Sequence, residues 1–331
     1  MIDFAGLAVL LLLVLGFGFL VTRAWRAKNA LLKWVGVVLA GLLTLVLTAA
    51  FVLAVAGTLK LNRNYNADHP VASITVAGTS EQVARGEKFA HFCAMCHGTD
   101  GQLPLSGQDF LGGGGGGPPV GTMWASNLTP GGELKDWSDG EIVRAIREGV
   151  HKNGRSLLIM PSEIFHNLSD DDAQAIVAYL RSQDPVTLDA PPNGLNVLGA
   201  MLVATMGEGF QMVQPHIAQP VTRPPEGTSA EYGHYLVSVV GCQLCHGDNL
   251  AGGKVGGGPP PGPNLTTLAP TWSEDGFIKT IRTGVDPTGH TLNPEDMPYK
   301  QISALASDDD LRAIYAYLHG LPALPDNPKG Q

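Results

Sequence analysis

The sequence predicts an all-α protein in which two membrane-spanning helices precede two small, homologous helical domains. Three observations support this prediction: two long uncharged apolar runs lie near the N-terminus, the rest of the chain repeats its own motifs, and strictly alternating apolar and polar residues are nearly absent. The length of 331 residues suits about two folded domains, and a hydrophobic content of 44% is enough to give each a core. The 42 glycines and 24 prolines indicate long loops between the helices.

The N-terminal segment predicts two transmembrane helices. Residues 4–22 and 34–58 are uncharged apolar runs, and at about 1.5 Å per residue each is long enough to cross a hydrocarbon core of roughly 30 Å. Neither run has a polar face, which excludes two helices of a soluble core. A cleaved signal peptide is the alternative, because Ala54-Val55-Ala56 resembles a processing site, but the start of the chain lacks the basic segment of a signal.

The connector between the two apolar runs, residues 23–33, predicts the orientation of the chain. It holds four basic residues and no acidic one, the composition of a short loop on the cytoplasmic side. Trp25 and Trp34 lie where aromatic residues mark the membrane interface. We therefore expect a two-pass protein of a bacterial inner membrane, with its N-terminus and its large C-terminal part on the periplasmic side.

The part of the chain beyond the apolar runs is acidic. Residues 61–331 carry 16 Lys and Arg against 29 Asp and Glu. An acidic body repels phosphate backbones, which excludes nucleic acid as a partner. Residues 61–79 are polar and predict a tether above the membrane, residues 189–228 are rich in proline and predict a linker, and residues 326–331 form a short tail.

Two homologous domains are predicted over residues 80–188 and 229–325. The motifs of the first copy recur in the same order in the second, which indicates a tandem duplication. The repeated pairs are Asn127-Leu128-Thr129 with Asn264-Leu265-Thr266, Trp137-Ser138 with Trp272-Ser273, Met160-Pro161 with Met297-Pro298, and Ala178-Tyr179-Leu180 with Ala316-Tyr317-Leu318.

Each copy is predicted to contain three amphipathic helices. The last one begins at Ser169 in the first copy and at Ser307 in the second, because each serine can cap the first turn and the acidic triplet after it suits the positive end of the helix dipole. Apolar residues at positions i, i+3, i+4 and i+7 then bury one face. The other predicted helices span residues 81–92, 140–148, 230–240 and 276–283.

All four cysteines fall in two Cys-x-x-Cys-His motifs, residues 93–97 and 242–246. Two thiols at this spacing can add across the two vinyl groups of one haem, while the histidine binds the iron. A zinc site and a thioredoxin-like dithiol are the alternatives, but neither explains a histidine at the same place in both copies. The sequence therefore predicts two covalently bound haem c groups, held by Cys93, Cys96 and His97 and by Cys242, Cys245 and His246.

A second axial ligand is predicted at Met160 and at Met297. Each methionine precedes a proline, which disfavours helix there and lets the thioether project from a loop onto the iron. The rival ligands are His151, His166 and His290, which lie close in sequence. Ligation by histidine and methionine raises the haem potential relative to two histidines and favours electron acceptance from quinol-level or dehydrogenase donors. The predicted metal ligands are thus His97, Met160, His246 and Met297, and no residue is predicted to be catalytic.

Two glycine-rich loops, residues 112–117 and 256–258, are each followed by prolines. A phosphate-binding loop is excluded, since no Gly-Lys-Ser/Thr follows either run. We expect these loops to wrap a flat macrocycle, with a proline carbonyl accepting the ring N–H of the iron-binding histidine. Trp137 and Trp272 are expected either to border the haem pockets or to pack in the core.

The linker has an apolar middle, residues 197–206, which is too short to span a membrane. We expect it to pack against the two domains; docking to a membrane partner is the alternative.

The two haem motifs and their Met-Pro dipeptides resemble those of the class I c-type cytochrome family, over roughly residues 80–188 and 229–322. The resemblance implies that the first and last helices of each domain cross at a glycine and an aromatic residue. The region from Met160-Pro161 to residues 185–186 also looks like the multihaem cytochrome subunits of periplasmic alcohol and aldehyde dehydrogenases. Those subunits typically carry three haem motifs behind a cleaved signal, whereas this chain has two motifs and an N-terminal hairpin. In this chain, the predicted crossings of the first and last helices of each domain would lie at Gly86 with Tyr179 and at Gly233 with Tyr317.

These features predict a membrane-anchored dihaem cytochrome c that passes single electrons along the periplasmic face. Its expected partners are the membrane, other subunits of a respiratory or photosynthetic complex or of a dehydrogenase, and an acceptor such as a terminal oxidase, a reaction centre or a soluble carrier. One alternative is the cytochrome subunit of an alcohol or aldehyde dehydrogenase. Another is a dihaem peroxidase, which needs an iron with an open position and which two Met-Pro ligands oppose. A redox or gas sensor is excluded, because the predicted cytoplasmic segment, residues 23–33, is too short to pass on a signal.

Overall fold

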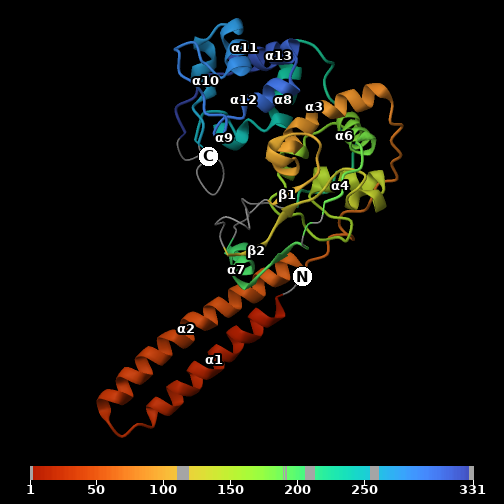
Figure 1. The fold of residues 1–331 in the computed structure, drawn as a ribbon. Coiled ribbons are helices and arrows are strands. Elements are labelled where there is room, and N and C mark those ends of the chain that lie inside the picture. Colours follow the sequence, from red (N-terminus) through yellow and green to blue (C-terminus); the bar gives the residue numbers. More distant parts are fainter. Residues whose placement is uncertain are drawn as a thin grey trace.

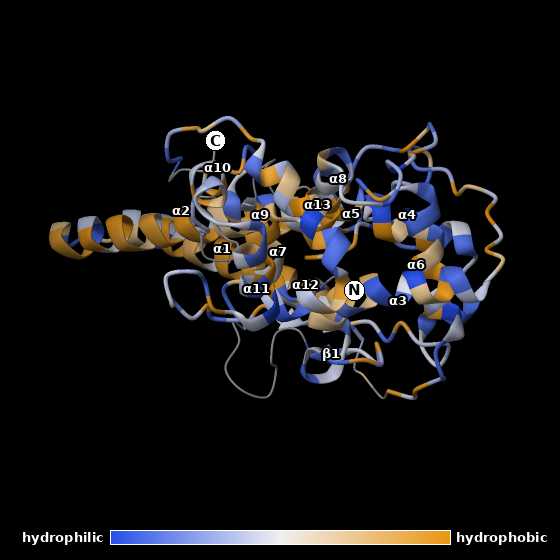
Figure 2. Cartoon of the chain, turned by 90° about the horizontal axis from the view of Figure 1, so that it is seen from above, coloured by the Kyte–Doolittle hydropathy of each residue, from blue (hydrophilic) through white to orange (hydrophobic). Residues whose placement is uncertain are grey.

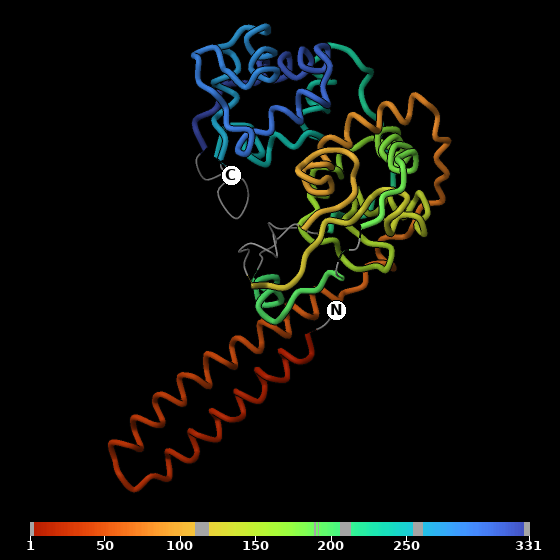
Figure 3. The backbone as a smooth tube through the Cα atoms, in the orientation of Figure 1, coloured from red at the N-terminus to blue at the C-terminus, as the bar shows by residue number. Residues whose placement is uncertain are grey.

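The computed structural model describes residues 3–109, 119–188, 190, 192–205, 213–253 and 261–327. It confirms the all-α prediction, with two N-terminal apolar helices followed by two helical domains (Figures 1 and 3). Among the described residues, β structure is limited to four strands of two residues. Strand β1 (Gln108–Asp109) pairs with β3 (Trp124–Ala125), and β2 (Gly121–Thr122) pairs with β4 (Gly194–Leu195), both antiparallel.

The first two helices form an antiparallel hairpin that projects from the rest of the molecule (Figure 1). Helix α1 (Phe4–Trp25) begins at a cap in which the Gly6 N–H donates to Asp3 Oδ1 at 2.8 Å, and the Asn29 side chain caps α2 (Ala30–Leu61). No residue of α1 is buried, and the surface of both helices is almost uniformly apolar (Figure 2). By length and composition each helix can cross a membrane.

Helix α2 is longer than the predicted run, because its helical hydrogen bonding continues through charged residues such as Lys60 that a hydropathy criterion excludes. The connector between the helices lies at the far tip of the hairpin, and the N-terminus lies at the end nearest the domains (Figure 3). There Asp3 Oδ2 accepts from the Val197 N–H at 3.1 Å.

The first domain is built on helices α3 (Ser80–His97) and α6 (Asp170–Ser182), which cross closely. A Cβ atom at Gly86 would overlap the carbonyl oxygen of Ala175 and would lie 2.8 Å from Cβ of Tyr179, so only glycine permits this crossing. The expected contact of Gly86 with Tyr179 is confirmed. Helix α4 (Asp139–Glu148), helix α5 (Ser162–Phe165) and the short 3₁₀ segments Thr99–Gly101 and Glu133–Asp136 complete this domain.

The second domain repeats this plan, with α8 (Ala230–Val240) crossing α13 (Asp308–His319) at Gly233. The missing Cβ of Gly233 faces the Ala313 carbonyl, while Tyr317 packs its ring 4.8 Å from that of His234. The remaining elements are α9 (Gln243–His246), α10 (Leu265–Leu268), the 3₁₀ segment Ala269–Thr271, α11 (Glu274–Thr283) and α12 (Tyr299–Leu305).

The two copies differ where the haem motif begins. In the first domain α3 runs unbroken through the motif, whereas in the second α8 ends at Gly241, whose φ of 78° is left-handed, and α9 carries the motif. The glycine explains the break, because it adopts this conformation without a steric penalty.

The apolar linker segment forms helix α7 (Val197–Thr205), which packs mainly on α2. A Cβ at Gly57 would overlap the Ala200 carbonyl, and Lys60 Nζ donates to the Val203 carbonyl at 3.4 Å. The expectation that this segment packs against the two domains was wrong, because most of its contacts are with α2. A helix that is apolar on all sides buries most surface against the most apolar neighbour, and α2 is that neighbour. Residues 206–212 of this segment lie outside the described residues.

Candidate haem sites

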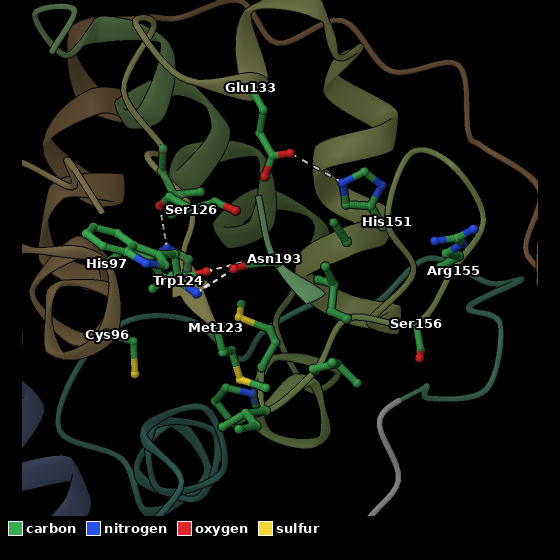
Figure 4. Close-up of a pocket in the computed structure, with 18 of the residues that line it drawn as sticks. Cys96, His97, Met123, Trp124, Ser126, Glu133, His151, Arg155, Ser156 and Asn193 are labelled. Atoms are coloured by element: carbon green, nitrogen blue, oxygen red, sulfur yellow. Dashed lines mark hydrogen bonds and ion pairs between the residues drawn. The ribbon is translucent and has the colours of Figure 1, made fainter. Parts of the chain in front are cut away.

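A cavity of about 610 Å³ is lined mainly by the first domain, and also by the domain-side end of the hairpin and by the linker. All four residues predicted to hold the first haem line it: Cys93, Cys96, His97 and Met160. Most of its remaining walls are apolar side chains from α3, α4 and α6 and from the loops between them. Figure 4 shows His97 and Cys96 on one side of this cavity and the pair Glu133 and His151 on another.

The ring of His97 is held in one tautomer. Its Nδ1–H donates to the Ser126 carbonyl at 2.8 Å (Figure 4), which leaves Nε2 unprotonated for a metal. Burial lowers the pKa of His97, while the Ser126 carbonyl opposes this shift in part. In the second domain His246 Nδ1–H donates to the Pro263 carbonyl at 2.7 Å, and burial again lowers the pKa of the imidazole. Both imidazole rings are therefore neutral and have a free Nε2, as the predicted iron ligation requires.

A proline carbonyl was expected to accept from each histidine ring. In the second domain the acceptor is a proline, Pro263, which lies just beyond the prolines that follow residues 256–258. In the first domain the expectation was wrong, because the acceptor is the carbonyl of Ser126. The geometry requires only a fixed carbonyl, which any residue can supply. The two glycine-rich loops, residues 112–117 and 256–258, lie outside the described residues.

The repeated Asn-Leu-Thr motif fixes these two carbonyls. Asn127 directly follows Ser126, and its Oδ1 accepts from the backbone N–H and the hydroxyl of the threonine two residues on, at 2.9 and 2.7 Å. Asn264, after Pro263, makes the same pair of bonds at 3.0 and 2.7 Å. Each asparagine Nδ2 also donates to a carbonyl in the segment after the last helix, so the loop is anchored on both sides.

Each Met-Pro dipeptide forms the same turn. The N–H of Ser162 donates to the Met160 carbonyl at 2.7 Å, and the N–H of Tyr299 donates to the Met297 carbonyl at 2.7 Å. The intervening prolines have φ and ψ of −77° and 58° in the first copy and −76° and 54° in the second, which is an inverse γ-turn. Both methionine side chains pack against the core as partly buried residues.

Of the rival histidines, only His151 lines the first cavity. Both of its ring nitrogens are engaged: Nε2 lies 3.3 Å from Glu133 Oε2, and Nδ1 accepts from the Asn153 N–H at 3.1 Å. This hydrogen bond to Glu133, with a contribution from Ser126, holds the pKa of Glu133 below its usual range against the effect of burial. His166 Nδ1 instead lies 3.1 Å from a backbone carbonyl, and His290 is exposed.

Two family models match this chain. One, described as cytochrome c, covers residues 83–184, and the other, described as cytochrome c oxidase, cbb3-type, subunit III, covers residues 229–318. The chain carries two cytochrome c domains. Each contains one Cys-x-x-Cys-His motif, and the protein therefore holds two covalently bound haem c groups.

Known relatives extend the similarity across both domains. The chain is 31% identical over 279 residues to a nicotinate dehydrogenase subunit of Pseudomonas putida, covering 77% of this chain and 23% of that protein. It is 29% identical over 272 residues to the cytochrome c subunit of the quinone alcohol dehydrogenase of Gluconobacter oxydans, covering 74% and 55%. A dihaem c-type cytochrome of Cereibacter sphaeroides is 25% identical over 277 residues, covering 75% and 88%. The chain thus spans about half or less of the first two relatives.

The first cytochrome c cavity fits its haem in donors and in shape. Two thiols, one imidazole with a free Nε2 and three thioethers, those of Met95, Met123 and Met160, line a mainly apolar space whose volume is typical of a cofactor pocket. Before attachment, burial raises the pKa of the Cys93 thiol to about 12. Arg155 lines the same cavity and supplies a positive charge suited to the haem carboxylates. Trp137 both lines the cavity and packs in the core, so its two expected roles coincide.

In the second cytochrome c domain a glycine packs directly against the ring of His246, the predicted iron ligand. A Cβ at Gly262 would lie 2.6 Å from two atoms of the His246 ring, closer than any side chain tolerates. Trp272 packs against the core, and its carbonyl accepts from Tyr315 Oη at 2.8 Å.

We expect Gly262→Val to displace His246 and to reduce the haem content of the purified protein from two per chain towards one. The added side chain occupies the place of the imidazole, so the second haem loses its iron ligand while the first domain is untouched. Pyridine haemochrome absorbance per mole of chain measures the effect. Gly320→Val is the control, because a Cβ there meets its nearest atom at 3.3 Å; equal haem loss in both variants would contradict the assignment.

Several residues of these sites were not predicted from the sequence, although an alignment of the two copies could have indicated some of them. Aligning the copies on their asparagines places Ser126 opposite Pro263, so the two carbonyl acceptors share one position. Met123 lines the first cavity as a further thioether, and its aligned position in the other copy is Pro260, so it has no counterpart there. Leu244 also lines this cavity although it belongs to the second motif, a contact that no sequence pattern carries.

Proposed function

We propose that the chain is a membrane-anchored dihaem cytochrome c that passes single electrons along the periplasmic face as the cytochrome subunit of a dehydrogenase complex. One observation carries the proposal: Leu244, between the two cysteines of the second haem motif, lines the cavity of the first. Two redox sites that adjoin in this way suit a relay.

The proposed attachment residues are Cys93 and Cys96 for the first haem and Cys242 and Cys245 for the second. His97 with Met160, and His246 with Met297, are the proposed axial ligands. When bound, each haem supplies an iron that gains and loses one electron. The protein's own contribution would be to hold the imidazole tautomers through the two carbonyls, to exclude water with apolar walls, and to supply an imidazole and a thioether to each iron. No residue is assigned a catalytic role, and the chain alone is proposed to transform no substrate.

The proposed path between the two haems runs through the contact of α5 with the end of α8. A Cβ at Gly241 would lie 2.5 Å from Cδ1 of Ile164, so the glycine allows close approach. Ile164 follows the Met160-Pro161 turn and lines the first cavity, while Gly241 directly precedes Cys242. The segment that follows Met160 in the first site thereby contacts the residue that precedes Cys242 in the second.

Anchoring is proposed through α1 and α2, with both domains on the periplasmic side of a bacterial inner membrane and the connector of residues 23–33 on the cytoplasmic side. The exposed apolar surface and the length of the two helices support this, since such a surface is typical of helices that lie in hydrocarbon. Helix α7, which leaves Leu198 and Leu202 about half exposed, would lie at the outer membrane surface. The cytochrome c domains are proposed to span residues 80–188 and 229–325.

The partner is proposed from the relatives, which include cytochrome subunits of alcohol, fructose and gluconate dehydrogenases. A catalytic dehydrogenase subunit would donate electrons, and a soluble carrier or terminal oxidase would accept them.

The test is affinity purification of the full chain from mildly solubilised membranes. We expect two haem c per chain, co-purification of a dehydrogenase subunit, and reduction of both haems when the substrate of that subunit is added. A variant in which a cleavable secretion signal replaces residues 1–60 should keep both haems and leave the membrane fraction. A full chain that carries two haems but purifies without a dehydrogenase, and is reduced by none of the copurifying proteins, would remove the partner from the proposal.

A further inference from the structure

A third cluster of metal-binding side chains lies away from both haem cavities, where three segments of the chain meet. His69 comes from the tether, Glu148 is the last residue of α4, and His216 belongs to the interdomain linker. One ligand atom from each side chain lies within 4.8 Å of the other two. His69 Nδ1 is 2.7 Å from Glu148 Oε2, and His216 Nδ1 is 2.9 Å from Glu148 Oε1.

The carboxylate at the centre of this cluster is in an unfavourable place for a negative charge. Glu148 is 5% exposed, and it ends a helix, where the backbone dipole is negative. In the described part of the chain its ion-pair partners are only the two histidines, and its Oε1 also accepts from the Ile217 N–H at 2.9 Å. A site of this kind favours a cation.

The guanidinium of Arg144, which interacts electrostatically with Glu148, makes its hydrogen bonds elsewhere. Its Nη1 donates to Asn66 Oδ1 and to the His69 carbonyl, both at 3.0 Å, and its Nη2 donates to the His151 carbonyl at 2.9 Å. Arg144 therefore attracts Glu148 through space without occupying its oxygens. It fixes the backbone of His69 and so helps to aim that imidazole at the carboxylate.

We propose that His69, Glu148 and His216 form a binding site for a divalent transition-metal ion of the zinc class. Two imidazole nitrogens and one carboxylate are a common ligand set for zinc with a fourth, open position for water. Tetrahedral bonds of about 2.0–2.1 Å separate ligand atoms by roughly 3.3 Å. The hydrogen-bonded atoms would therefore part by about 0.5 Å, while the most widely separated ligand atoms, which lie within 4.8 Å of one another, would approach by up to about 1.5 Å. His216 can supply that movement, since its side chain is 32% exposed and its segment has no regular secondary structure.

The surroundings provide entry and support for the ion. A cavity of about 310 Å³ opens beside Glu148 and His216, which gives solvent access and space for a water ligand. The Gln214 N–H donates to the Glu148 carbonyl at 3.0 Å, so the linker is already bound to the end of α4 before any ion arrives. The bound ion would join the tether and the linker to the first domain and would restrict the orientation of both.

The experiment uses the detergent-purified full chain with both haems attached, treated with EDTA, incubated with zinc ion alone, and desalted. The two haem irons count the chains, so elemental analysis is expected to give one zinc for every two irons. Glu148→Gln and His216→Asn should each weaken zinc binding at least about tenfold in a competitive chelator titration. His234→Asn, which removes an exposed imidazole from α8, should bind zinc as the unmodified chain does.

X-ray absorption at the zinc edge should show nitrogen and oxygen ligands and no sulfur. Unchanged haem spectra in all variants would confirm that they fold. The proposal would be overturned if the full chain retained no zinc at about 10 µM, or if Glu148→Gln bound zinc as well as the unmodified chain. In either case the three side chains would have only a structural role, through their hydrogen bonds.

Discussion

Met160→Leu is expected to lower the reduction potential of the first haem by on the order of 0.1 V or more and to open its iron to carbon monoxide. Leucine keeps nearly the volume of methionine, so the packing loss should stay below about 1.5 kcal/mol and the domain should fold. The change removes only the sulfur that is proposed as the iron ligand, while the ring of His97 keeps its carbonyl acceptor at 2.8 Å.

Potentiometric titration of the purified chain, followed in the visible haem bands, measures this effect because the two haems then titrate separately. Met297→Leu should shift the second haem in the same way. Carbon monoxide should bind one haem per chain in either single variant and both haems in the double variant.

Met123→Leu is the matched control for this experiment, since Met123 is another thioether in the wall of the same cavity. It lies outside the γ-turn and lacks a counterpart in the second copy, so its replacement should leave the potential unchanged. If Met123→Leu opened the iron and Met160→Leu did not, the ligand would be reassigned to Met123. If neither did, His151 would be the next candidate.

The features that could be predicted from sequence are those whose chemistry is local. The Cys-x-x-Cys-His motif specifies a haem within five residues, and Ser169 and Ser307 are observed to cap their helices as their spacing indicates. The two Met-Pro turns could be expected from the restricted backbone of proline and from the internal repeat, while iron ligation by the two methionines stays a prediction. The crossing glycines followed from family resemblance, and Gly86 meets Tyr179 as that resemblance implies.

The features that could not be predicted depend on contacts between distant segments. The carbonyls of Ser126 and Pro263 are backbone groups, which no residue type marks. The packing of α7 on α2 depends on which of several apolar surfaces is nearest in space. A sequence pattern also contains no information on how the second domain docks on the first, although that contact brings Leu244 into the first cavity.

The domain contact has a buried charge at its centre. Asp172 is fully buried at the first turn of α6, and its Oδ2 accepts from Tyr235 Oη of the second domain at 2.5 Å and from Arg85 Nη2 at 3.0 Å. The Ser169 N–H donates to the same tyrosine oxygen at 3.1 Å. Burial, followed by the Asp172 charge, raises the pKa of Tyr235, so the phenol stays protonated and remains a donor.

We expect Asp172→Ala to destabilise the chain by about 3 kcal/mol, because Arg85 then loses its principal partner while it stays largely buried. Tyr235→Phe should cost about 1–3 kcal/mol by leaving Asp172 short of one donor. Both variants should loosen the domain contact, so that limited proteolysis cuts the linker faster and electron exchange between the haems slows. Thermal unfolding and pulse radiolysis of the half-reduced protein measure the two effects.

Asp310→Ala provides the matched control, since Asp310 holds the same position of the last helix in the second domain. Its carboxylate accepts from Ser307 of its own helix end and reaches no residue of the first domain within the described chain. Losing that cap should cost only about 1 kcal/mol and leave the exchange rate unchanged. A drop in exchange rate as large in Asp310→Ala as in Asp172→Ala would mean that general loss of stability, rather than the contact of Tyr235 with Asp172, controls how closely the two haem sites approach.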